Sequence, residues 1–210
     1  MGEIKDRIPI QWEDGEMVFA LKPAGIASQS PGMPERLAAE LGVETVYPVH
    51  RLDKEASGVM VYAKTKSAAA ALSAAIANGE MEKEYLAMVT GTPAPVGEMR
   101  DLLYHDPRRN KSFVVTRARH GVREAILTYE VIRTVGDRSL VKVRLETGRT
   151  HQIRVQFASR GYPLIGDARY GGGKGEMHLF SHRITVRHPK TGEPVTVESR
   201  PEWGDDAGAF

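Results

Sequence analysis

Strand-length runs of apolar and β-branched residues recur along this chain, and short turn-forming segments join most of them. Three pairs of runs are interrupted by turns rich in Gly, Asp or Pro, at residues 13–16, 135–138 and 188–192. Apolar runs on both sides of such turns predict β-hairpins, here over residues 8–21, 126–146 and 179–199. Strict alternation of strand and helix is absent. We therefore predict an α+β fold, with a largely antiparallel, mixed β-sheet flanked by helices and loops, and not a doubly wound parallel sheet.

Three helices are expected between the strands. The first follows Pro34, which suits a first helical position, and Gly42 ends it. The second is the alanine-rich stretch between Ser67 and Gly79, where Ser67 serves as the N-cap. Residues 151–160 combine helical apolar spacing with β-branched residues, and we favour a helix there. Further strands are predicted at residues 58–64 and 85–89.

Composition limits the class of protein. A chain of 210 residues that is 41% hydrophobic can bury a sizeable core, and it has no internal repeat or linker. We expect one domain over residues 8–200 and a loose tail over 201–210. The absence of cysteine excludes disulfides, thiolate nucleophiles and cysteine metal sites. Residues 1–6 are polar with no apolar run behind them, so we expect no signal peptide, no membrane span and a cytoplasmic location.

Charge is informative only locally, because the net charge is +2. The segment 105–123 contains a single acid, Asp106, and six basic residues: Arg108, Arg109, Lys111, Arg117, Arg119 and Arg123. Such asymmetry is typical of an element that faces phosphates, although a solvated basic hairpin has the same composition.

Three polar stretches next to apolar runs are candidates for chemistry: residues 50–53, 83–85 and 147–154. In the first, Asp53 lies in a connection before a strand, where its carboxylate can face a cleft. Such a carboxylate can act as a nucleophile if a cation keeps it ionised, and Arg51, Arg149 and Arg154 are the available cations. By composition alone, an Asp–Arg pair that closes a turn is the commoner arrangement, and Tyr85 is more often a core aromatic.

The three stretches lie within longer motifs that resemble, in the same order along the chain, those of a known enzyme family. Residues 49–64 (VHRLDKEASGVMVYAK) closely resemble the signature of the RluA-type pseudouridine synthases, whose defining residue is the Asp of HRLD. Residues 83–91 (KEYLAMVTG) are similar to the family's K-x-Y strand, and residues 147–155 (TGRTHQIRV) with residues 161–171 (GYPLIGDARYG) resemble its TGRTHQIRV…GDxxYG block. The opening KPAGI at 22–26 and the closing residues 179–192 also match, so the resemblance covers about residues 8–200.

The resemblance implies an enzyme that isomerises uridine in structured ribosomal or transfer RNA to pseudouridine. Asp53 would be the essential residue, as a nucleophile or base at the sugar or at the uracil. Tyr85 would pack against the target uracil, Arg154 would pair with Asp53, and Arg51 would fill the space left by the flipped base. Further RNA contacts are expected from a set of polar and basic side chains: His50, Arg149, Arg108, Arg109, Lys111, Arg117 and Arg119.

Two departures from the family pattern are visible. Ala56 stands where the family usually has Thr, which removes a hydroxyl from the turn that presents Asp53. Too little chain precedes the motifs to hold the family's N-terminal S4 RNA-binding module, so we expect a stand-alone catalytic domain. We also expect the protein to be a monomer.

No cofactor or metal is expected. His178 and His182 have the spacing of a helical metal pair, but they lie in a strand-like run, where this spacing separates the rings. The glycines of residues 171–175 do not fit a phosphate-binding loop, and we predict a flexible surface loop. Two other function classes stay open: a noncatalytic RNA-binding domain on the same fold, and a nucleoside hydrolase, which would need a second carboxylate near Asp53.

Overall fold

The structure of the protein is a computed structural model that describes residues 7–203. Contacts divide these residues into two compact units, which are described separately. The first unit comprises residues 7–83 and 180–201, and the second comprises residues 84–179 and 202–203. The expectation of a single domain over residues 8–200 stays a prediction.

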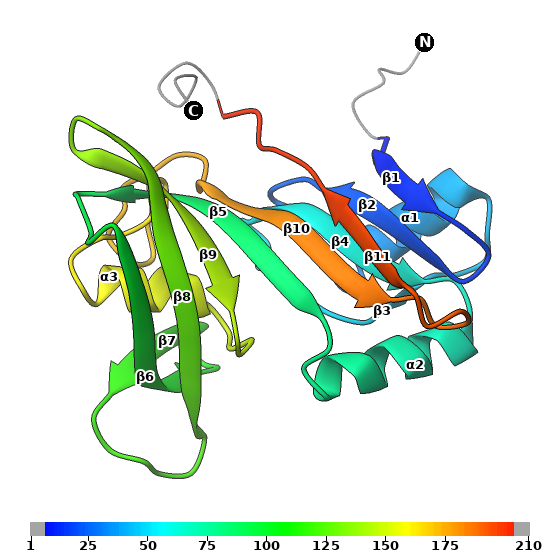
Figure 1. Cartoon of the computed structure of the whole chain (residues 1–210), viewed down its shortest axis with the longest axis horizontal. Coiled ribbons are helices and arrows are strands. Elements are labelled where there is room, and N and C mark those ends of the chain that lie inside the picture. Colours follow the sequence, from blue (N-terminus) through cyan, green and yellow to red (C-terminus); the bar gives the residue numbers. More distant parts are fainter. Residues whose placement is uncertain (1–6, 204–210) are drawn as a thin grey trace. The chain divides into compact units, whose positions relative to one another are not determined.

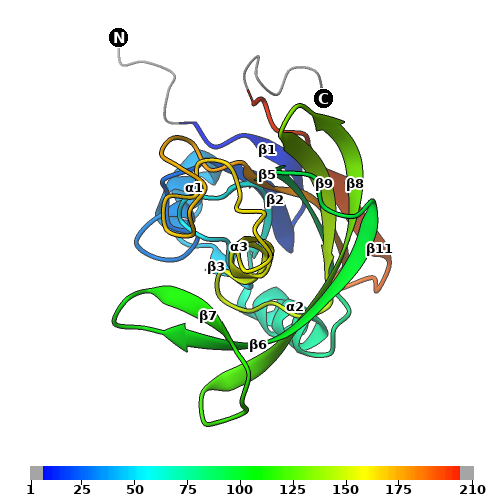
Figure 2. The ribbon, with the colours of Figure 1, turned by 90° about the vertical axis from the view of Figure 1, so that its left-hand side faces the viewer.

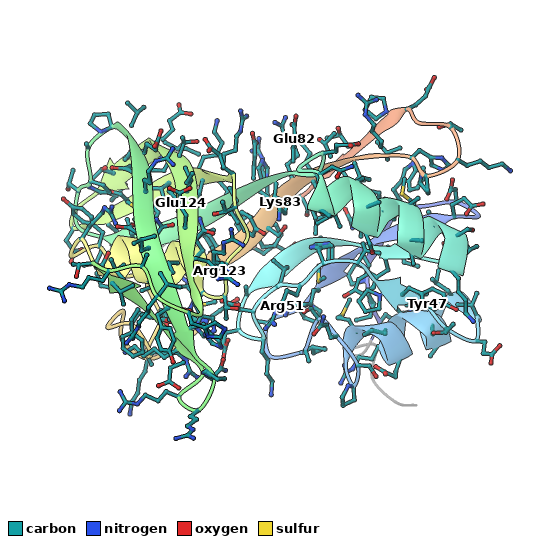
Figure 3. All side chains as sticks on the ribbon, turned by 90° about the horizontal axis from the view of Figure 1, so that it is seen from below. Tyr47, Arg51, Glu82, Lys83, Arg123 and Glu124 are labelled. Carbon is teal, nitrogen blue, oxygen red and sulfur yellow. The ribbon has the colours of Figure 1, made fainter. Side chains whose placement is uncertain are left out.

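The first unit is a sheet with one helix on either side (Figures 1 and 3). Its strands run in the order β1-β2-β4-β10, with β3 beside β4 and β11 beside β10. The pairing of β4 with β10 is parallel, and the other pairs within this unit are antiparallel. The elements are β1 (Ile10–Glu13), β2 (Met17–Lys22), α1 (Met33–Leu41), β3 (Tyr47–Pro48), β4 (Ser57–Ala63), α2 (Lys66–Ala77), β10 (Leu179–Arg187, from Phe180 in this unit) and β11 (Pro194–Glu198).

Alternation along β4 explains why the sheet is covered on both faces. Val59, Val61 and Ala63 pack in a cluster with Leu72 of α2, whereas the intervening Tyr62 donates its hydroxyl to the Ser28 carbonyl, 3.2 Å away, in the segment before α1. Successive strand residues point to opposite faces, so a strand that is buried throughout needs a layer on each side.

The second unit is an antiparallel sheet that curves around one helix (Figure 2). Its strands run in the order β5-β9-β8-β6-β7, so β7 is an edge strand of this unit. Leu103, Ala125 and Val155 form a cluster that packs α3 on the sheet. The elements are β5 (Glu82–Thr90, from Glu84 in this unit), β6 (Val96–Asp106), β7 (Lys111–Val115), β8 (Val122–Val135), β9 (Arg138–Leu145) and α3 (Gln152–Ala158).

Most of the predicted elements are confirmed. The three hairpins, the three helices and the α+β class are present, including the helix that we favoured within residues 151–160. Gly42 ends α1 in the left-handed conformation, as expected. One helix boundary was wrong: the N-cap of α2 is Thr65, whose Oγ1 accepts the Ala68 N–H at 3.1 Å, and not Ser67. The strands β3, β6 and β7 were not predicted, although a basic hairpin was one interpretation of residues 105–123.

The end of the chain differs in part from the expectation. Residues 204–210 of the predicted loose tail lie outside the described residues. Before them, the Trp203 ring stacks on His178, with ring centroids 4.9 Å apart, and packs against the cluster of Leu86, Met88 and Leu140. A partly buried aromatic therefore anchors the first part of the segment that we expected to be loose.

Gly58 is required where β4 meets β10. It is paired with Ser181, its φ is +116°, and a Cβ at this position would overlap the Ser181 backbone. Only glycine combines this backbone conformation with so close an approach of a second strand.

We predict that Gly58→Ala lowers the free energy of unfolding by more than about 3 kcal/mol, or prevents folding, since both the backbone and the strand pairing must shift. Gly79→Ala is the control. Gly79 also has a positive φ, +77°, but open space surrounds its missing Cβ, so the expected cost is about 1–2 kcal/mol. Urea unfolding followed by circular dichroism measures both, and equal losses would contradict the steric argument.

Candidate active site

The connection that carries Asp53 is held by hydrogen bonds on both sides of this residue. On one side, the Ser28 hydroxyl donates to the Leu52 carbonyl at 2.9 Å and accepts the Leu52 N–H at 3.2 Å. On the other, the Lys54 carbonyl accepts the Gly25 N–H at 2.8 Å. Asp53 itself is partly exposed. The loop thus presents a carboxylate from a backbone that two segments of the first unit keep in place.

Lys22 supplies a second restraint on the same loop. Its side chain is buried, and its ammonium group donates to the carbonyls of Pro23, Ile26 and Lys54 at 2.9, 2.8 and 3.1 Å. Burial lowers the pKa of Lys22 to about 8, while the carboxylates of Asp53 and Glu55 act in the opposite direction. Three acceptors match the three donors of an ammonium group, so the hydrogen bonds stabilise both the charge and the loop.

Ala56 does not leave the Asp53 turn open. The Ala56 N–H donates to the Asp53 carbonyl at 3.1 Å, and the Ala56 side chain is buried. The backbone therefore closes the turn without the hydroxyl that the family usually has here.

His50 and Arg51 precede Asp53 and differ in character. His50 Nε2 accepts the Val61 N–H at 3.1 Å, and burial, together with the charge of Lys83, lowers the pKa of His50 to about 3. His50 is therefore neutral near pH 7, and it could contact RNA only as a neutral group and not as a cation. Arg51 is exposed, and Figure 3 shows its long side chain on the first unit.

In the second unit, Tyr85 occupies a central position in β5. It pairs with Val143 of β9 and is 6% exposed. The neighbouring Glu84 is also buried and forms an ion pair with Arg144, at 2.6 Å between Oε1 and Nη2. The position of Tyr85 is thus set by strand pairing on a rigid element.

Gln152 organises the segment 147–154 before α3. Its Oε1 accepts the Arg149 N–H at 3.0 Å and the Thr147 hydroxyl at 2.9 Å, while its Nε2 donates to the Ile126 carbonyl at 3.0 Å. Arg149 is exposed, and its Nε donates to the Glu124 carbonyl at 2.8 Å. One buried amide therefore ties the loop to β8 and determines where α3 begins.

Arg154 is buried and forms a bidentate ion pair with Asp167. The distances are 2.7 Å from Nε to Oδ2 and 2.9 Å from Nη2 to Oδ1, and both side chains are nearly inaccessible. The guanidinium carbon also lies 5.3 Å from the centroid of the Tyr170 ring. The carboxylate that pairs with Arg154 in the second unit is therefore that of Asp167. The expected pairing of Arg154 with Asp53 stays a prediction.

The basic segment forms a hairpin, which we call the basic hairpin: β6, the turn 107–110 and β7. Arg108 and Arg109 are exposed in its turn, and their N–H groups donate to Asp106 Oδ1. Lys111 is half-buried, with its ammonium group 5.1 Å from the ring centroid of Tyr170. Arg117 and Arg119 are exposed in the loop that follows β7. Of these five basic residues, which we expect to contact RNA, the four arginines are therefore exposed. Lys111 is partly covered by an aromatic ring.

The remaining candidates have local structural contacts. His182 Nδ1 lies 2.5 Å from the Ser199 carbonyl oxygen, and the ring of His178 stacks on Trp203. Within residues 7–203, no group of three or more His, Asp or Glu side chains could hold a metal ion. Over the same range, no helix is both long and apolar enough to cross a membrane.

The glycine-rich loop is more constrained than predicted at one position. The Gly172 N–H donates to the Asp167 carbonyl at 2.8 Å, and the Gly172 carbonyl accepts the Gly166 N–H at 2.9 Å. A Cβ on Gly172 would overlap the Leu164 carbonyl oxygen. The expectation of a flexible surface loop is therefore wrong at Gly172, because close packing requires glycine there.

A comparison with protein families decides the class. The model of the RNA pseudouridylate synthase family matches residues 16–159, which include the Asp53 connection, β5 and α3. The chain belongs to this family. Its RluA type agrees with relatives named ribosomal large subunit pseudouridine synthase D, one of which, from Zymomonas mobilis, is 34% identical over 219 residues, covering 91% of this chain and 68% of the relative.

Other relatives carry the same family name. An uncharacterized RNA pseudouridine synthase, YhcT, from Bacillus subtilis is 34% identical over 91% of this chain and 68% of its own length. A Synechocystis relative, an uncharacterized RNA pseudouridine synthase, is 31% identical over 90% of this chain and 64% of its own length. The chain thus spans about two thirds or less of the curated relatives that it matches first.

Solved structures confirm the pseudouridine synthase fold. Human RNA pseudouridylate synthase domain containing 1 has a TM-score of 0.80 and 20% identity, over 96% of this chain and 86% of that one. Human RNA pseudouridylate synthase domain containing 4 has a TM-score of 0.77 and 20% identity, over 92% of this chain and 89% of that one.

Several residues that organise the candidate site were not singled out from the sequence. Asp167 and Tyr170 stand in the GDxxYG block, and Gln152 in TGRTHQIR, but we assigned no role to them there. The available signal was the carboxylate of Asp167, which stands in the same motif block as Arg154, because a buried guanidinium requires a carboxylate partner.

Lys22 should make the stability of this protein depend on pH in the alkaline range. Its pKa in the folded state is about 8 and its ordinary value is 10.5, so between these two pH values the unfolded state binds more protons. The free energy of unfolding should therefore rise with pH across that window, by up to about 3 kcal/mol from this group. Urea unfolding at pH 7 to 10.5 measures the slope.

The Lys22→Met variant should lack this rise and be less stable at pH 9, because three carbonyls lose their donor. Lys66→Met, which removes an exposed amine at the start of α2, is the control for loss of a lysine. If Lys22→Met kept the wild-type slope, the buried ammonium group would not be its source.

Proposed function

We propose that this protein is an RNA pseudouridine synthase that isomerises specific uridines in structured ribosomal or transfer RNA, with Asp53 as the essential catalytic residue. The observation that carries the proposal is family membership through a match that includes the HRLD motif, with Asp53 on a loop held at both neighbouring residues. Relatives named for the ribosomal large subunit favour ribosomal RNA. We further propose that the protein works in the cytoplasm as a monomer.

The reaction exchanges one bond for another within a single nucleotide. The bond between ribose C1′ and uracil N1 breaks, the uracil turns, and C1′ bonds to C5. C5 then loses its proton and N1 gains one, so no oxidant, nucleotide or added cofactor is needed. Asp53 acts as a nucleophile or base at the sugar or at the uracil, Tyr85 packs against the uracil, and Arg154 supports the negative charge of Asp53.

The target uracil must leave the RNA stack before Asp53 reaches it. Arg51 is our proposed wedge, because an exposed guanidinium combines a planar face for stacking with a charge for phosphate. Further RNA contacts are assigned to exposed or partly exposed groups of both units: His50, Arg149, Arg108, Arg109, Lys111, Arg117 and Arg119.

We predict that Asp53→Asn lowers turnover at least about 100-fold, since the amide is neither nucleophile nor base. The substrate is total RNA from cells that lack the gene, labelled with tritium at uracil C5, and the measurement is release of tritium to water. Asp137→Asn is the matched control, because Asp137 is an exposed aspartate in the β8–β9 turn.

Each alternative makes a different set of products. Release of free uracil would indicate a hydrolase, and RNA binding without tritium release by the wild type would indicate a noncatalytic binding domain. Near-wild-type release by Asp53→Asn would remove Asp53 from its role. Pseudouridine mapping in cells with and without the gene identifies the modified position.

A second prediction separates affinity from base extrusion. Changing Arg108, Arg109, Arg117 and Arg119 to Gln should weaken RNA binding and reduce the slope of log affinity against log salt by about 0.7–0.9 for each lost phosphate contact. The single-turnover rate on saturating RNA should persist. Arg51→Ala should instead slow that rate, with comparatively little change in affinity.

Filter binding at several salt concentrations and single-turnover kinetics measure the two quantities. Arg133→Gln, an exposed arginine of β8 outside the basic hairpin, is the control. Normal RNA binding by the variant with four arginines changed, or an unchanged saturated rate in Arg51→Ala, would contradict this division.

A further inference from the structure

We propose that Tyr170 is a positioning residue that docks the basic hairpin against the segment carrying Arg154, and so determines where RNA phosphates are held during the reaction. The inference rests on the proposed function, and it concerns the second unit alone. Tyr170 does not act on the substrate in this proposal.

The hydroxyl of Tyr170 joins two segments. It accepts the Ser112 N–H of β7 at 2.7 Å, and it lies 3.0 Å from Nδ1 of His151, the N-cap residue of α3. An edge strand normally leaves such N–H groups for water or for another chain. Here a tyrosine hydroxyl takes the place of a neighbouring strand.

Ser112 provides a second link at the same point. Its side chain is almost completely buried, and its hydroxyl donates to the Thr150 carbonyl at 2.6 Å. His105 pairs with Ser112 across the hairpin, and its Nδ1 lies 3.2 Å from the Ser112 hydroxyl oxygen. The hairpin is therefore attached through one residue to both the loop before α3 and the Tyr170 turn.

The ring of Tyr170 is in contact with cations from both sides of the junction. The guanidinium carbon of Arg154 lies 5.3 Å from the ring centroid, and the ammonium group of Lys111 lies 5.1 Å from it. Cations at such distances are attracted to the electron-rich face of an aromatic ring. Arg154, whose partner Asp167 lies three residues before Tyr170, is thus linked to β7 through a single side chain.

Arg169 holds the tip of the hairpin. Its Nη1 donates to the carbonyls of Arg109 and Asn110 at 3.0 and 2.9 Å, where Asn110 has a φ of +45°. Consecutive residues of one turn thus contact the tip and β7 of the hairpin. The exposed Arg108 and Arg109 extend from this tip, so a displaced hairpin would displace the phosphate contacts assigned to them.

Tyr170→Phe tests the proposal because it removes only the hydroxyl and keeps the ring beside Arg154 and Lys111. In the free protein, amide hydrogen exchange over residues 106–115 should accelerate about 10-fold, while α3 keeps its protection. The KM and the Kd for the labelled RNA should rise about 3- to 10-fold, and the single-turnover rate on saturating RNA should stay within about 2-fold of wild type.

Two variants accompany it. Tyr129→Phe removes the same atom from β8, where the ring packs on Phe157 with centroids 5.2 Å apart, and it should behave as wild type. Arg169→Lys keeps the charge on a side chain that is one bond shorter, which should weaken the hydrogen bonds to both carbonyls, and it should raise exchange at the tip and the KM in the same way as Tyr170→Phe. It also tests the docking if Tyr170→Phe does not fold.

Unchanged exchange and KM in Tyr170→Phe would overturn the proposal, as would a slower saturated rate at an unchanged KM. The proposed function fails separately, if the wild type releases no tritium. Hydrogen exchange and filter binding do not require turnover, so they test the docking in either case.

Discussion

Burying a cation costs several kcal/mol unless its N–H groups find acceptors and its charge finds compensation. Each unit contains one such cation close to residues that we propose for catalysis. Lys22 donates to three carbonyls and lies near Asp53, and Arg154 forms a bidentate pair with Asp167. In both cases the acceptors belong to loops, whose backbone is not stabilised by the hydrogen bonds of the sheet. The need to satisfy a buried charge therefore restrains these connections, which carry or adjoin the groups that we propose for function.

The same logic explains how the second unit supports an edge strand. β7 is short, and no strand in the described part of the unit lies on its outer side. The Tyr170 hydroxyl accepts the Ser112 N–H, as a neighbouring strand would have done, and the Thr150 carbonyl of the loop before α3 accepts the Ser112 hydroxyl. This arrangement leaves the arginines of the hairpin turn exposed while their backbone is held. Exposed charge on a restrained backbone suits phosphate binding, because little conformational entropy remains to be lost on association.

Much of the fold could be predicted because its signals are local. Turn residues separated the hairpins, Gly42 ended α1, and the alanine-rich composition identified α2. The errors have physical causes as well. Thr65 caps α2 because its hydroxyl reaches the Ala68 N–H, and a sequence with Thr65 and Ser67 two residues apart does not distinguish the caps. β6 was missed because the expected strand pattern is interrupted by charged residues that face outward, such as Arg100 with its partner Glu124.

By itself, the sequence determined the α+β class, the family through its long motifs, and the residue types available for chemistry, since each of these depends on identity and order along the chain. Only the tertiary structure decided which charged side chains form ion pairs and which polar groups are buried. The partner of Arg154 among the described contacts is Asp167, His50 is neutral, Lys111 is partly covered, and Gly172 is locked by packing. Pairing, burial and close approach are relations between segments distant in sequence. Their energies depend on distance and solvent exposure, which no local pattern encodes.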